Sequence, residues 1–95
     1  MRLVSQDGMV DVPYEISALS IGRIGESATI YVRSKLLDEK PCIFATYSNA
    51  DKAIKVMEML REEYLKYYTA RASEYWFAFN NPKAFKFPVD EEVEV

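Results

Sequence analysis

Residues 48–72 read SNADKAIKVMEMLREEYLKYYTARA and have the clearest helical periodicity in the chain. Apolar side chains recur every three or four residues and so share one helical face: Ala53, Val56, Met57, Leu60, Tyr64, Tyr67 and Tyr68. Charged side chains fall on the opposite face: Lys52, Lys55, Glu58, Glu62, Glu63 and Lys66. The pattern predicts one long amphipathic helix with Ser48 as its N-cap. The helix ends near Ala72 or continues to Phe79. It cannot continue farther, because Asn80-Asn81-Pro82 is a strong stop signal.

Two β-hairpins are predicted before this helix. Asp7-Gly8 is typical of a type I′ turn, and a loop of these two residues pairs Leu3 with Val12. Gly25-Glu26 suits a type II′ turn, which pairs Ile21 with Ile30. Both registers place apolar side chains on one face, as in a half-buried antiparallel sheet.

Two further strands complete the predicted fold. Residues 41–47 are apolar on both faces, so we expect a strand in the centre of the sheet. Residues 85–87 alternate as a short aromatic strand, and residues 89–95 form an acidic, mobile tail. The expected class is α+β: an antiparallel sheet of about five short strands packed by one long helix. Residues 1–88 form its single domain.

The composition limits the possible functions. The 95 residues are 49% hydrophobic and carry a formal net charge of −3, as expected for one folded domain. The chain has no histidine, which excludes Ser-His-Asp and Cys-His nucleophiles and histidine-containing zinc sites. The single cysteine, Cys42, cannot form an internal disulfide, and no apolar run is long enough to cross a membrane. We therefore expect a cytoplasmic protein that is not an enzyme, needs no metal or cofactor and has no membrane partner.

A dense aromatic segment is the candidate interaction surface. Its four rings lie within five residues and cannot all face one way: Tyr75, Trp76, Phe77 and Phe79. In one interpretation they form a second small core with residues 85–87. In another they form a protein-binding surface anchored by Trp76. The same surface could also hold two copies of the chain together as a two-fold homodimer. A third interpretation uses the rings to stack single-stranded nucleic acid, but the net negative charge makes that partner unlikely.

Segments along most of the chain resemble small uncharacterised proteins of Firmicutes phages and prophages. The segments are MRLVSQDG (1–8), DVPYE (11–15), VMEMLR (56–61), FKFP (85–88) and DEEVEV (90–95). The resemblance implies a phage origin and expression inside a Gram-positive host. Together with the lack of a catalytic system and the exposed aromatic segment, it leads us to expect a small phage accessory protein that binds a host or phage protein. It assigns no activity to the family, so no catalytic residue is carried over.

Overall fold

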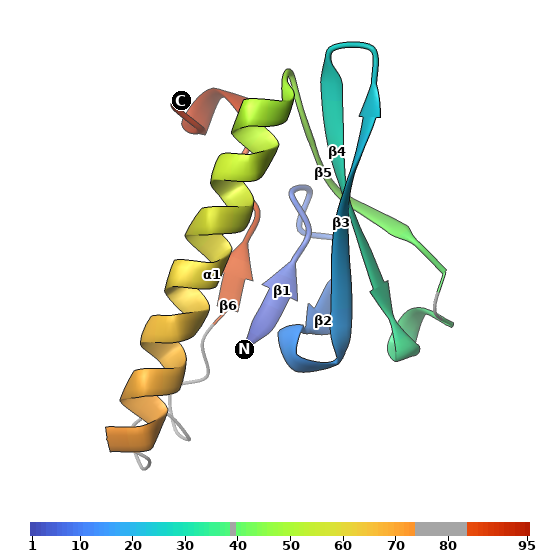
Figure 1. Cartoon of the computed structure of the whole chain (residues 1–95). Coiled ribbons are helices and arrows are strands. Elements are labelled where there is room, and N and C mark those ends of the chain that lie inside the picture. The colour runs from blue at the N-terminus through green and yellow to red at the C-terminus, as the bar shows by residue number, and fades with distance from the viewer. Residues whose placement is uncertain (39, 74–83) are drawn as a thin grey trace.

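The computed structural model describes residues 1–38, 40–73 and 84–95, and within them the strands form two three-stranded sheets beside one long helix (Figure 1). Sheet A has the order β2 (Asp11–Pro13), β1 (Arg2–Val4) and β6 (Ala84–Lys86). Sheet B has the order β3 (Ser17–Ile24), β4 (Ser27–Ser34) and β5 (Cys42–Tyr47). The α1 helix spans Ala50–Ser73, and short 3-10 turns cover Tyr14–Ile16, Lys35–Leu37 and Asp90–Glu92. The α+β class is confirmed, whereas two sheets replace the single predicted one.

Both predicted hairpin registers are confirmed. Leu3 lies opposite Val12, and Ile21 lies opposite Ile30. Gly25 has a φ of +61°, as a type II′ turn requires at its first central position.

The first turn is not of type I′, because Gly8 has a positive φ of +77° but Asp7 does not. Its Gly8 N–H instead donates to the Ser5 carbonyl at 2.9 Å. The Asp7 carboxylate accepts hydrogen bonds from the Ser5 hydroxyl and the Met9 N–H, so side-chain bonding closes this loop.

Gln6 connects the two sheets. Its backbone N–H donates to the Phe44 carbonyl at 2.7 Å. Its side-chain Oε1 accepts from the Thr46 N–H at 3.1 Å, while Nε2 donates to the carbonyls of Thr46 at 3.3 Å and Pro88 at 3.0 Å. The side-chain amide thus bonds to both the N–H and the C=O of Thr46, as the backbone of a neighbouring strand would at the outer edge of β5.

The prediction that residues 41–47 form the central strand is wrong, since β4 lies between β3 and β5. The apolar run in β5 has another cause, a β-bulge: Ile30 pairs with Ala45 and Tyr31 with Ile43, so Phe44 is an extra residue. Phe44 and its neighbour Ala45 are therefore both buried instead of alternating between the two faces. The Phe87 ring packs against Phe44 edge-on, with ring centroids 5.9 Å apart.

Helix α1 buries most of its predicted apolar face against the sheets. Ala53, Val56 and Leu60 are fully buried, but Tyr68 is 59% exposed because the helix extends beyond the strands (Figure 1). The N-cap is Asn49 rather than Ser48: the Asn49 side chain accepts a hydrogen bond from the Lys52 N–H at 2.9 Å. The alternative of a helix that continues to Phe79 lies outside the described residues.

The C-terminal segment belongs to the folded domain. β6 pairs in parallel with β1, which confirms the predicted C-terminal strand. Asp90 accepts a hydrogen bond from the Ser48 N–H at 2.8 Å and forms an ion pair with Lys52. Val93 is only 3% exposed, so the expected acidic tail is docked on the domain as far as this residue. Val93 supplies an apolar anchor that the acidic composition of the segment conceals.

Candidate functional site

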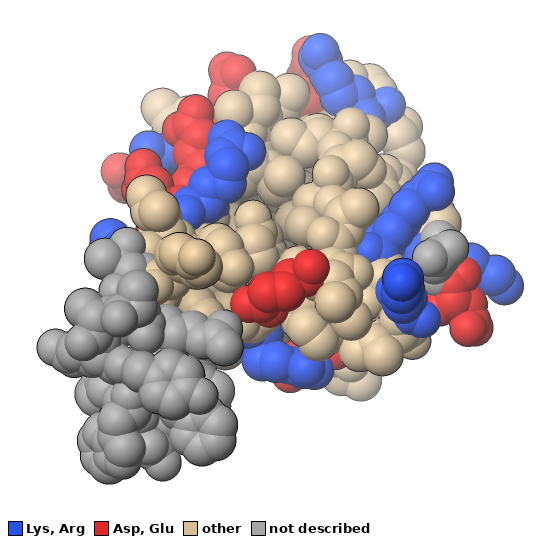
Figure 2. Space-filling view, turned by 60° about the horizontal axis from the view of Figure 1, so that its bottom comes forward, with Lys and Arg blue, Asp and Glu red and all other residues tan. Residues whose placement is uncertain are grey.

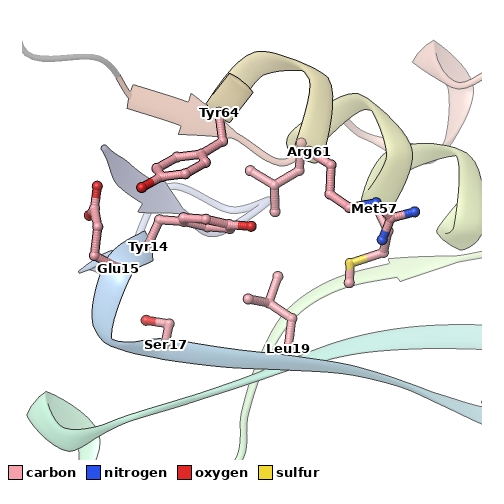
Figure 3. Close-up of a pocket in the computed structure, with 8 residues that line it drawn as sticks. Tyr14, Glu15, Ser17, Leu19, Met57, Arg61 and Tyr64 are labelled. Carbon is pink, nitrogen blue, oxygen red and sulfur yellow. The ribbon is translucent and has the colours of Figure 1, made fainter. Parts of the chain in front are cut away.

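A groove of about 440 Å³ runs between edge strand β3 and helix α1 (Figure 3). This volume lies within the range of about 300–1,000 Å³ that is usual for ligand sites. One wall comes from β3 and the 3-10 turn that precedes it, and the other comes from α1. The lining residues are Tyr14, Glu15, Ser17, Leu19, Met57, Leu60, Arg61 and Tyr64.

Two tyrosines close one end of the groove. The rings of Tyr14 and Tyr64 lie 4.4 Å apart at an angle of 38°, and Figure 3 shows them one above the other between β3 and α1. Leu19 points up from β3 toward the helical wall. The Glu15 carboxylate accepts a hydrogen bond from the N-terminal amine at 2.7 Å, so its negative charge is paired. The groove thus combines apolar side chains with polar and charged ones, and its one carboxylate already has a partner.

The helical wall continues as a stripe of side chains that are exposed or, at Met57, half-buried, spaced three or four residues apart on the flank of α1 that borders the groove. Three of its apolar members are well exposed: Ile54 by 47%, Leu65 by 65% and Tyr68 by 59%. Arg61 is its one charged member. We call this set the helical stripe; it comprises Ile54, Met57, Arg61, Leu65 and Tyr68.

The strand wall offers unpaired backbone groups. Ile24 and Ser27 flank a two-residue loop and so form a hydrogen-bonded pair, after which bonded and non-bonded pairs alternate along β3 and β4. The backbone N–H and C=O groups of Leu19, Ile21 and Arg23 therefore point away from β4. Among the described residues, no other backbone group bonds to them.

Arg61, which lines the groove, and Arg23, which lies farther along β3, are both without an ion-pair partner in the described part of the chain. Arg61 is exposed on α1, and Arg23 is exposed near the end of β3. The four ion pairs of the described residues use other basic groups. The face of the molecule in Figure 2 shows acidic and basic side chains interspersed without a broad basic area.

A second polar cluster holds the C-terminal segment in place. The Tyr47 hydroxyl donates to the Pro88 carbonyl at 2.7 Å, and burial raises the pKa of this phenol. The hydrogen bond from the Ser48 N–H holds the pKa of Asp90 below its usual value. These contacts bind one part of the chain to another, so we assign them a structural role.

The predicted interaction residues Tyr75, Trp76, Phe77 and Phe79 lie outside the described residues. The aromatic strand that was expected to cover them uses its own rings elsewhere: Phe85 and Phe87 pack in the main core. Sequence reasoning missed the groove, although Ile54 and Leu65 share the helical spacing of Met57 and signalled a second apolar flank.

Within the described residues no group of three or more acidic, cysteine or histidine side chains gathers in a way that could hold an ion. Cys42 is half-buried at the start of β5, beside the core. No helix in the described ranges combines the length and hydrophobicity needed to cross a lipid bilayer.

Comparison with known proteins adds no relative: no protein-family model, curated protein or solved structure matches the chain.

Proposed function

We propose that this protein is a non-enzymatic binding domain that holds a segment of another protein in the groove between β3 and α1. The supporting observation is the helical stripe. Helix α1 already buries one face in the core, yet Ile54, Leu65 and Tyr68 remain exposed beside the groove. Clustered exposed apolar side chains usually mark a contact surface.

The residue types in the groove favour a protein partner. Tyrosine, methionine and arginine are enriched in protein interfaces, and all three occur here as Tyr64, Met57 and Arg61. Met57 has an unbranched, flexible side chain that can adjust to the shape of an incoming group. Tyr14 and Tyr64 provide rigid apolar area with polar tips.

The resemblance to phage proteins favours a partner encoded by a phage or its bacterial host. That origin stays a prediction, as does the alternative of single-stranded nucleic acid stacked on Tyr75, Trp76, Phe77 and Phe79. Homodimerisation through the same four residues also stays a prediction.

A displayed library of random dodecapeptides tests the proposal and requires no assumption about the identity of the partner. Peptides selected on the native protein are measured against Met57→Glu, which places a charge in the groove, and against Ile43→Glu. Ile43 is the matched control because it is a 59% exposed apolar residue on β5, outside the groove. We expect Met57→Glu to weaken binding at least tenfold and Ile43→Glu to leave it unchanged. Failure to enrich any peptide, or equal affinity for both variants, would refute the proposal.

A further inference from the structure

We infer that the groove binds its partner by strand addition: an extended, acidic segment of the partner pairs with the free edge of β3. This inference rests on the proposed function and specifies the chemistry of the occupant. The decisive juxtaposition is a strand edge that no other described strand pairs with, next to a groove lined partly by apolar side chains. Domains that bind peptides by β-augmentation combine these same two features.

The edge of β3 lacks the usual protection against pairing. Natural edge strands carry proline, lysine or bulges that prevent a further strand from joining. β3 reads SALSIGRI, so Arg23 is its one charged residue, and its register with β4 is continuous over all eight positions. Leu19, Ile21 and Arg23 present successive outward N–H and C=O groups, which an extended segment can pair.

Strand geometry then fixes which side chains of the segment enter the groove. Residues directly opposite each other on paired strands place their side chains on the same face. Leu19 and Ile21 are half-buried and packed against the core on the face of sheet B that α1 covers. Every second side chain of the added segment therefore lies between β3 and α1, in reach of Met57 and Tyr64. These alternate residues must be apolar.

Two arginines that have no ion-pair partner among the described residues favour an acidic segment. Arg61 stands on the helical wall beside Met57 (Figure 3), and Arg23 lies farther along β3, beyond the residues that line the groove. The one acidic side chain in the lining, Glu15, is already paired with the N-terminal amine. Opposite charges across an interface give specificity and faster association. An acidic residue next to the apolar positions therefore fits this site.

A second copy of this chain is a poorer occupant for the groove. If two β3 strands paired, Leu19 and Ile21 of the second copy would be covered by the α1 helix of that copy. Those side chains would not be available to fill the groove of the first. The occupant must instead be a segment that is extended and has no helix packed on its apolar face.

The test uses a peptide selected from the dodecapeptide library and two variants at one position. Ile21→Pro removes the outward N–H and spares the bonds to β4, while Ile21→Ala removes a similar part of the side chain and keeps the N–H. We expect Ile21→Pro to bind the peptide at least fivefold more weakly than Ile21→Ala. Equal affinity for two folded variants would overturn strand addition while leaving groove binding intact.

Peptide chemistry gives a second readout that does not depend on the folding of a variant. N-methylation of successive peptide residues should weaken binding at every second position, because alternate N–H groups face β3. Effects without this period would overturn the inference. Replacing the acidic residue of the peptide by lysine should weaken binding to the native protein at least fivefold and restore it with Arg61→Glu. A selected peptide without an acidic residue would overturn the assigned charge.

Sedimentation equilibrium of the protein alone tests whether a second copy of the chain, and not a peptide segment, pairs with the edge of β3. We expect Ile21→Pro and Ile21→Ala to have the same oligomeric state. A native dimer that dissociates with Ile21→Pro and persists with Ile21→Ala would assign the edge of β3 to a second copy and overturn the peptide occupant.

Discussion

Replacing Gln6 by methionine should destabilise the protein more than its surface position suggests. Methionine keeps the length and flexibility of the side chain but forms none of the three hydrogen bonds of the amide to Thr46 and Pro88. A neutral hydrogen bond contributes about 0.5–1.5 kcal/mol net, and water can replace part of this at the exposed Thr46. We therefore expect a loss of about 1–3 kcal/mol in the free energy of unfolding.

Urea unfolding followed by circular dichroism measures this loss. Ser20→Ala is the control, because Ser20 is exposed on β3 and should change stability by less than about 0.5 kcal/mol. The reasoning assigns the connection between sheet A and β5 to the Gln6 amide. If Gln6→Met unfolds at the same urea concentration as Ser20→Ala, the side-chain bonds do not hold the two sheets together.

Three further predictions concern the helix and its contacts. Leu60→Ala should destabilise by about 2–5 kcal/mol because Leu60 is fully buried, while Glu62→Ala on the outer face should cost under about 0.5 kcal/mol; equal urea midpoints would contradict the helix orientation. Asn49→Ala should cost about 0.5–2 kcal/mol through loss of the N-cap, and a larger loss for Ser48→Ala would reverse the assignment. The pKa of Asp90 is lowered in the folded state, so its carboxylate stabilises the fold above its unfolded pKa of about 3.9, and the effect is lost as pH falls through the folded pKa. Asp90→Asn should thus lower the melting temperature more at pH 6 than at pH 2, and an equal shift at both would contradict the linkage.

Local sequence patterns were enough to predict the hairpins and the helix. Alternating apolar residues with a glycine turn specify a register between neighbouring strands, as Leu3 with Val12 and Ile21 with Ile30 show. The turn type at Asp7 was mistaken because it depends on side-chain hydrogen bonds as well as on turn propensity.

Contacts between distant parts of the chain could not be predicted in the same way. The parallel pairing of Leu3 with Phe85 joins residues from the two ends of the chain, and no local periodicity encodes it. The Gln6 bridge is equally non-local. Ser48 and Asn49 are both good N-cap residues, so their residue types alone did not decide between them. In the structure Asn49 caps the helix, and Ser48 contacts Asp90 from the far end of the chain.

The groove was only partly visible in the sequence. The helical period of residues 48–72 identified the buried face, and the spacing of Ile54 and Leu65 from Met57 could have indicated a second flank that the sequence analysis did not consider. The helical period does not show which strand lies beside that flank, and in the structure this strand is β3. The open edge of β3 follows from the sheet order, which places β4 and not β3 in the centre.

Residue-resolved hydrogen exchange tests the central claim most directly, with the native protein measured alone and with a selected dodecapeptide. In the free protein the outward amides of Leu19 and Ile21 should exchange quickly, whereas those of Ser20 and Gly22, which bond to β4, should be protected. Addition of the peptide should slow exchange at Leu19 and Ile21 at least tenfold. Unchanged exchange at these two amides, with protection appearing at another surface instead, would contradict the account.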